Sequence, residues 1–153
     1  MTYEMQDSIV VPATPQEVHA LLSDVTRTGE WSQQCERCVW EGEQRGVGAR
    51  FTGYNRTPVR EWQTVSEVVA DVPGEHFAWS VGPGRAEWGY RMRPAAGGGT
   101  ELTQYTRTSP ALAEHFTARF GDRAEAEIAQ RREAARIGIP ATLEAIRAVL
   151  AGH

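Results

Sequence analysis

The chain has 153 residues, a length typical of one domain, and a formal net charge of −4 at pH 7. Its hydrophobic content of 41% and charged content of 24% are those of an ordinary soluble globular protein. The acidic balance excludes the concentrated basic face that nucleic-acid binding requires. Every one of the 16 basic residues is arginine, which a GC-rich bacterial genome explains.

The sequence predicts neither a secretory signal nor a membrane span. The N-terminus, MTYEMQDSIVV, lacks the basic segment and apolar run of a secretory signal, and no apolar stretch reaches membrane-spanning length. Two cysteines are too few for a disulfide-stapled secreted fold. We therefore expect a cytoplasmic protein with one domain over residues 1–153.

The first quarter of the chain predicts one strand and two short helices. Residues 3–11 end in β-branched residues before Pro12, which favours a strand. Thr14 is the expected N-cap of a helix, with Glu17 placed for a capping box. Residues 24–32 predict a second short helix, interrupted by Gly29.

Six strands are predicted next, at residues 37–43, 49–56, 60–72, 76–81, 85–93 and 101–108. The fifth of these alternates strictly between aromatic or apolar residues and charged ones, which is typical of a half-buried strand. Short turns, such as Pro73-Gly74, join consecutive strands into an antiparallel meander. Residues 111–120 then predict a helix.

The last element, residues 122–150, predicts one long helix of about 45 Å at ~1.5 Å per residue. One face is apolar at three- and four-residue steps: Ala124, Ile128, Ala135, Ile139, Leu143, Ile146 and Leu150. Such a stripe needs a broad partner, and a curved sheet is the natural one. Pro140 is expected to bend the helix. The fold class is thus α+β: a curved antiparallel sheet of about seven strands around a long C-terminal helix, with two short helices after strand 1.

This order resembles the helix-grip superfamily of START-like and Bet v 1-like proteins (SRPBCC), often labelled polyketide cyclase/dehydrase. The likeness covers the whole chain and is carried by VVPATPQEVHALLSDV, GEWS, GARFTGYNR, EVVADVPGEHFAWSV and GGGTELTQY. It implies an internal cavity between the sheet and the C-terminal helix that holds a small hydrophobic or aromatic ligand. Members of this superfamily include lipid-binding-like proteins and cyclase-type enzymes, and fold similarity alone does not show which of these functions the chain has.

Aromatic residues dominate the strand faces expected to point inward. The sheet is poor in leucine, with Leu102 the only one between Cys35 and Thr108, whereas a dry core is normally built from Leu, Ile and Val. Each tryptophan taken alone fits an ordinary core, but the set fits a ring-lined cavity with polar tips. The predicted ligand-binding residues are Trp31, Phe51, Asn55, Trp62, Phe77, Trp79, Trp88, Tyr90, Gln104, Phe116, Ile139 and Leu143.

Four polar residues are candidates for chemistry in such a cavity. Asn55 could orient a ligand carbonyl and Arg56 could be a cation at the rim, although both could instead belong to the turn before Pro58. Gln104 follows Leu102 on an inward face, and His115 lies near the expected cavity mouth, where it could act as acid or base or simply be solvated.

Cys35 and Cys38 form a CxxC pair without the features of a metal or redox site. Structural zinc needs about four ligands, no second pair exists, and the histidines are scattered. A thioredoxin-type pair opens a helix, whereas this one precedes a strand. We therefore interpret both as structural thiols and expect no metal and no cofactor.

Two functions from different classes remain. The first is binding of a small hydrophobic or aromatic molecule, which we favour because no catalytic constellation is recognisable. The alternative is a polyketide cyclase/dehydrase-type enzyme that folds a polyketide-like chain and polarises a carbonyl or moves a proton with Asn55, Arg56, Gln104 or His115. Neither function requires a nucleic-acid partner or a membrane-spanning segment. A homodimer is possible from the sequence. A protein-binding co-chaperone role has little support.

Overall fold

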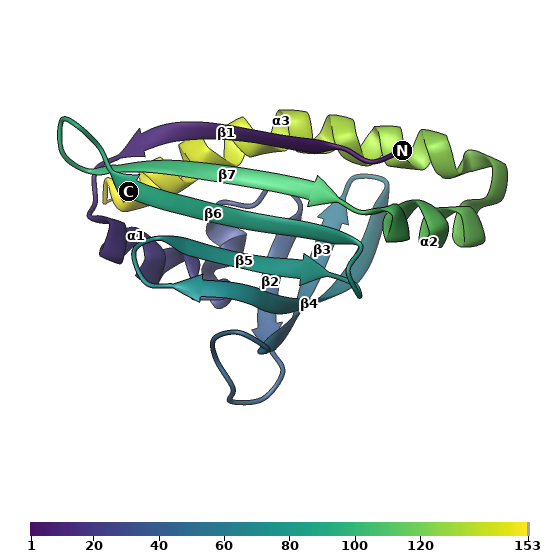
Figure 1. Ribbon diagram of the computed structural model, residues 1–153, viewed down its shortest axis with the longest axis horizontal. Helices are drawn as coiled ribbons and strands as arrows, with labels where there is room; N and C mark the ends of the chain where they lie inside the picture. Colours follow the sequence, from purple (N-terminus) through teal and green to yellow (C-terminus); the bar gives the residue numbers. More distant parts are fainter. Residues whose placement is uncertain (153) are drawn as a thin grey trace.

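The computed structural model describes residues 1–152, and its centre is a seven-stranded antiparallel sheet in the order β1-β7-β6-β5-β4-β3-β2 (Figure 1). The strands are β1 (Glu4–Val11), β2 (Cys35–Trp40), β3 (Arg50–Thr57), β4 (Arg60–Val72), β5 (His76–Val81), β6 (Ala86–Pro94) and β7 (Thr100–Thr108). Strands β2 to β7 are a meander of sequential neighbours, as predicted, and β1 closes the far edge by pairing with β7.

Two helical segments follow β1 and three precede the C-terminus. They are α1 (Pro15–Leu22), η1 (Val25–Glu30), α2 (Pro110–Phe120), η2 (Gly121–Arg123) and α3 (Ala124–Leu150). The predicted capping box of α1 is present: the Glu17 backbone N–H donates to Thr14 Oγ1 and the Thr14 N–H donates to the Glu17 carboxylate. Within the described residues no helix is both long and apolar enough to cross a membrane.

Helix α3 runs unbroken through Gly138 and Pro140 and lies along the β1 edge of the sheet (Figure 1). Its predicted apolar face is confirmed, because six of the seven stripe residues are buried and Leu150 is half-buried. The bend expected at Pro140 stays a prediction.

The core divides into three clusters. The C-terminal half of α3 packs with α1 and strands β1, β6 and β7, through residues that include Leu143, Ile146 and Leu102. Helix η1 covers β2 to β5 around Phe77, and α2 packs on the start of α3 through Phe116. The inner face of the sheet, meaning the face toward α1, η1 and α3, is therefore covered by several elements rather than by α3 alone.

The segment boundaries differ slightly from expectation. Helix η1 is a tight 3-10 helix, and β2 begins at Cys35, two residues before the predicted start. Cys35 therefore lies in the strand together with Cys38 rather than before it.

Two register shifts interrupt the ladder, one in β4 between Val68 and Ala70 and one in β2 between Cys35 and Arg37. An extra residue in one strand reverses the side-chain alternation beyond it. After the β4 shift Asp71 pairs with Phe77 and faces inward, where its carboxylate lies 2.6 Å from His19 Nε2 of α1. The shift thus explains why a helix histidine is buried against the sheet.

Leu143 provides a test of this packing. Its side chain is 1% exposed, so Leu143→Ala should lower the free energy of unfolding by about 2–5 kcal/mol through lost contacts and an internal cavity. Ile137→Ala is the matched control, because Ile137 is on the same helix and 59% exposed, and it should cost under about 0.5 kcal/mol. Chemical denaturation measures both, and equal losses would mean that the helix packs through another face.

Candidate functional site

Aromatic rings form a continuous row across the inner face of the sheet. The ring centroids of Trp40 and Phe51 are 5.6 Å apart, those of Phe51 and Trp79 are 6.2 Å apart, and those of Trp79 and Tyr90 are 5.8 Å apart. Trp88 joins the row because it is the cross-strand partner of Trp79. Ring contacts therefore connect Trp40, Phe51, Trp79 and Tyr90 on one face, and that these rings and Trp88 line a ligand cavity stays a prediction.

Exposure separates the predicted ligand-binding residues into two groups. The buried group packs into the core clusters: Trp31, Phe51, Phe77, Tyr90, Phe116, Ile139 and Leu143. The half-buried group remains reachable by solvent: Asn55, Trp62, Trp79 and Trp88. The ring of Tyr90 packs among core residues, and burial raises the pKa of its hydroxyl, while its contact with a ligand stays a prediction.

Gln104 is the most unusual polar group on this face. Its side chain is 5% exposed, and its amide oxygen is buried without a hydrogen-bond partner. On β7 it lies between Asp7 of β1 and Tyr90 of β6 in the register of the sheet. Leaving a buried acceptor unpaired costs about 1–3 kcal/mol. Such an atom is a natural place for a bound molecule to donate a hydrogen bond.

Asn55 lies at the β3–β4 end of the inner face. Its amide nitrogen is 3.3 Å from Thr64 Oγ1 and 3.4 Å from the carbonyl oxygens of Gly53 and Trp62. Asn55 thus lies in β3 opposite Trp62 rather than in the turn before Pro58, and these contacts occupy its amide nitrogen within the β3–β4 ladder.

Arg56 and Arg60 lie on opposite faces at this end of the sheet, with Arg60 beside Trp62 on the inner one. The Arg56 guanidinium faces the other way, with ion pairs to Glu61 and, at 3.4 Å, to Glu36. The Arg60 guanidinium lies 3.8 Å from the ring centroid of Trp62. Burial, followed by the charge of Arg131 on α3, lowers the pKa of Arg60. The strand and helix periodicities of the sequence do not single out Arg60 as a candidate site residue.

His115 stands apart from the other candidates. Its ring centroid is 6.0 Å from that of Phe116, and burial together with Arg85 and Arg119 lowers its pKa. Among the described residues, no hydrogen bond joins any two of Asn55, Arg56, Gln104 and His115. The arrangement offers a hydrophobic face with single polar groups, not an assembled acid–base pair.

Cys35 and Cys38 lie on the same inner face, with their Sγ atoms 3.3 Å apart. Within residues 1–152 no group of three or more His, Cys, Asp or Glu side chains is arranged to hold a metal ion. The two thiols are free.

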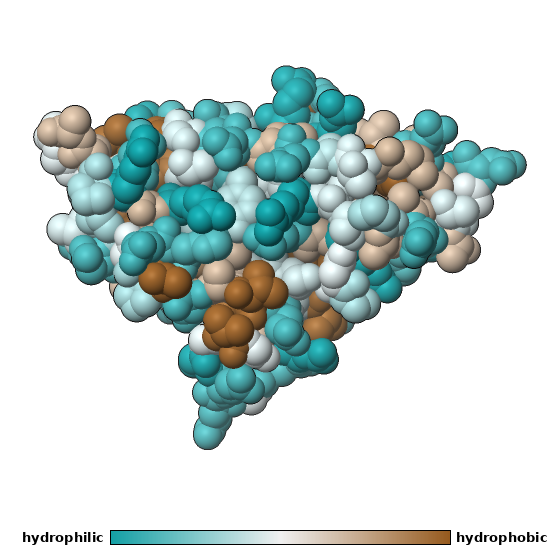
Figure 2. Space-filling view, viewed as in Figure 1, coloured by the Kyte–Doolittle hydropathy of each residue, from teal (hydrophilic) through white to brown (hydrophobic). Residues whose placement is uncertain are grey.

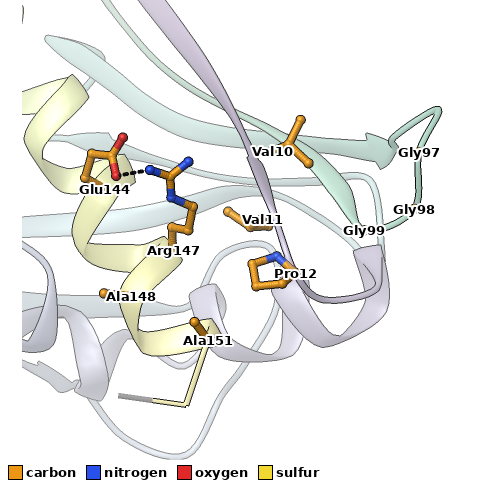
Figure 3. Close-up of a pocket in the computed structure, with 10 residues that line it drawn as sticks. All are labelled: Val10, Val11, Pro12, Gly97, Gly98, Gly99, Glu144, Arg147, Ala148 and Ala151. Atoms are coloured by element: carbon orange, nitrogen blue, oxygen red, sulfur yellow. Dashed lines mark hydrogen bonds and ion pairs between the residues drawn. The ribbon is translucent and has the colours of Figure 1, made fainter.

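The two pockets described in the structure lie away from the ring wall. One, of about 710 Å³, lies where β1, the β6–β7 loop and the end of α3 meet, and Glu144 and Arg147 pair with each other along it (Figure 3). None of the predicted site residues lines it. The other, of about 440 Å³, opens on the outer face of the sheet beside His76 and Arg91.

The outer face carries hydrophobic groups in its lower part, where β4 lies (Figure 2). The exposed valines of this strand are Val65, Val69 and Val72. Most of the remaining surface in this view is hydrophilic.

A buried polar chain also lies on the outer face. The Tyr105 hydroxyl donates to Glu87 at 2.5 Å and lies 2.8 Å from His76 Nε2. Gly89 makes room for the ring, because a Cβ there would lie 2.5 Å from the Tyr105 hydroxyl oxygen. Burial, then repulsion from Arg91, lowers the pKa of His76.

His76 should therefore make stability depend on pH. The folded protein holds the His76 pKa below the unfolded value of about 6.5, so its contribution is fully present above pH 6.5 and is lost as the pH falls toward the folded pKa. His76→Gln should flatten the decline in unfolding free energy between pH 7 and pH 5. Glu87 titrates below this window, because hydrogen bonds from Tyr105 and Arg107 outweigh burial and lower its pKa. An unchanged slope in the variant would contradict the assignment.

Comparison with known proteins agrees with this architecture. A family model described as "Polyketide cyclase / dehydrase and lipid transport" matches residues 2–150. The chain belongs to this family, which is of the SRPBCC type expected from the sequence. Its fold is one that binds hydrophobic ligands. A comparison with curated proteins found no significant match.

Solved structures give the same fold. A Polyketide_cyc-like protein of Corynebacterium glutamicum, determined by solution NMR, is 45% identical, with a TM-score of 0.72 over 99% of this chain and 93% of that one. The di-domain aromatase/cyclase StfQ of the steffimycin biosynthetic pathway is 16% identical (TM-score 0.71), over 97% of this chain and 50% of its own. A major latex-like protein of Panax ginseng is 10% identical (TM-score 0.59), over 71% and 80%. The latter two show the fold alone.

Proposed function

We propose that the chain binds a small planar aromatic molecule between the inner face of the sheet and α3. The supporting observation is that Trp79 and Trp88, cross-strand partners on the inner face, are half-buried, whereas the next pair on that face, Phe77 and Tyr90, is buried. Large rings left reachable by solvent on a mostly buried face gain free energy when a ligand covers them, at about 25 cal/mol per Å².

The polar requirement of the ligand follows from Gln104. Its unpaired amide oxygen accepts hydrogen bonds and cannot donate them, so a ligand with a hydroxyl group satisfies it where a pure hydrocarbon does not. Discrimination by such buried groups is strong because a ligand without the donor leaves the acceptor unpaired. A hydroxylated polycyclic aromatic, the kind of molecule that polyketide chemistry produces, combines both features.

Binding is favoured over catalysis for this chain. The polar candidates on or near the inner face do not touch one another, and general acid–base catalysis needs groups within hydrogen-bond reach of the same substrate atoms. An enzyme of the cyclase/dehydrase type remains the alternative, because the family description includes that activity. Turnover of a polyketide-like substrate by the purified protein would establish it instead.

The ring wall is tested by tryptophan fluorescence. A hydroxylated anthraquinone should quench the emission of the wild-type protein saturably. Trp88→Ala should raise the dissociation constant by about tenfold, equivalent to ~1.4 kcal/mol of lost contact. Trp40→Ala is the matched control, since Trp40 lies in β2 at the other end of the ring row and should change the constant much less. Equal effects, or no saturable quenching with a panel of such compounds, would refute the proposal.

Gln104→Leu tests the polar contact separately. This variant keeps side-chain volume and removes the unpaired oxygen, so folding stability should be unchanged or higher. Affinity for the hydroxylated anthraquinone should fall about tenfold, whereas affinity for anthracene, which has no hydroxyl, should not fall. Titration calorimetry on both ligands measures the difference, and parallel losses would show that Gln104 does not contact the hydroxyl.

A further inference from the structure

The bulge in β2 brings two thiols together that a regular strand would separate. Residues three apart in a strand point to opposite faces. Here Cys35 pairs with Asn55 and Cys38 pairs with Gly53, with the register shift between them, so both side chains point inward. Their Sγ atoms are 3.3 Å apart, and each lies within 4 Å of the position that a Cβ on Gly53 would occupy.

Local contacts hold this arrangement in place. The Cys35 backbone N–H donates to Ser32 Oγ at 3.0 Å, which fixes the start of the strand. Gly29 of η1 packs directly on the bulge, because a Cβ there would lie 2.1 Å from the carbonyl oxygen of Glu36. The glycine that interrupts the predicted short helix is thus required by the bulge.

The two thiols are not equivalent. Cys35 is half-buried and reachable by solvent, whereas Cys38 is 7% exposed. The hydrogen bond from the Cys38 thiol holds the pKa of Cys35 below its ordinary value, and the same contact together with burial raises the pKa of Cys38. An accessible thiolate beside a buried thiol is the asymmetry that reactive dithiols show.

We propose that Cys35 and Cys38 form an oxidisable dithiol that reacts with hydroperoxides and closes to an intrachain disulfide. Cys35 is the attacking thiolate and Cys38 the resolving thiol. The proposal of a dithiol site follows from the geometry of β2. It does not depend on the aromatic ligand proposed above.

The oxidation of the two thiols by a hydroperoxide proceeds in two steps. The Cys35 thiolate attacks one oxygen of the hydroperoxide, the O–O bond breaks, and Cys35 becomes a sulfenic acid while an alkoxide or hydroxide leaves and takes a proton from water. The Cys38 sulfur then attacks Cys35 Sγ, forming the S–S bond and releasing water with the Cys38 proton. The two sulfurs lose two electrons in total, and a dithiol reductant restores the starting state.

The test uses the purified chain, reduced and freed of reductant, then treated with hydrogen peroxide. Intact mass should fall by about 2 Da, the loss of two hydrogens, with both free thiols consumed, no dimer formed, and full reversal by dithiothreitol. Cys38→Ser should stop at the sulfenic acid and be trapped by dimedone, while Cys35→Ser should give no adduct at the same peroxide dose. Circular dichroism checks that both variants fold.

Other products would overturn the proposal. Stepwise gains of about 16 Da per oxygen without loss of hydrogen, disulfide-linked dimers, or equal dimedone labelling of the two single variants would each mean that the thiols do not act as a pair. None of these outcomes bears on aromatic-ligand binding, so the two proposals fail separately.

A pH profile distinguishes a reactive pair from two merely adjacent thiols. Alkylation of Cys35 by iodoacetamide should show a higher midpoint pH in Cys38→Ala than in Cys38→Ser, because serine can still donate a hydrogen bond to the thiolate and alanine cannot. Identical midpoints would show that Cys38 does not activate Cys35.

Discussion

The apolar stripe of α3 is the constraint on which the rest of the structure depends. A helix of 27 residues with charged residues on one side is not stable alone in water, so its stripe must be covered by the sheet. The cover comes from β1, β6 and β7, where Leu102 and Met92 meet Ile139, Leu143 and Ile146. Because α3 lies toward this edge, the inner face of β3 to β5 is left to η1, α1 and its own large side chains.

Sequence periodicity was sufficient for the elements and their faces. The strict alternation of β6 and the three- and four-residue spacing of α3 each depend only on which side of an element is buried, and both were confirmed. The two bulges were not predictable, since one extra residue leaves no compositional mark. They decide where Asp71, Cys35 and Cys38 point.

The candidate site shows the limit of the same reasoning. The alternating pattern of β6 places Tyr90 and Trp88 on the same face of the strand, but it does not show what covers each ring. In the structure Tyr90 is buried and Trp88 is half-buried. Gln104 was found from its alternation with Leu102, whereas the lack of a partner for its oxygen is visible only in three dimensions. Arg60 was missed because its stacking on the Trp62 ring is a contact between side chains that no periodic pattern records.

The half-buried Trp62 and the two thiols share one end of the inner face for a common physical reason. Cys35, Asn55 and Trp62 are consecutive neighbours across β2, β3 and β4, in the part of the sheet farthest from the β1 edge along which α3 lies. Because α3 does not reach this part of the face, the short helix η1 and wide side chains fill it, and the Arg60 cation lies over the half-buried Trp62 ring. Without the bulge at Glu36, Cys35 would point to the outer face and the inner face would carry no reachable thiol. The same incomplete cover that leaves Trp62 half-buried therefore leaves the Cys35 thiol reachable by an oxidant.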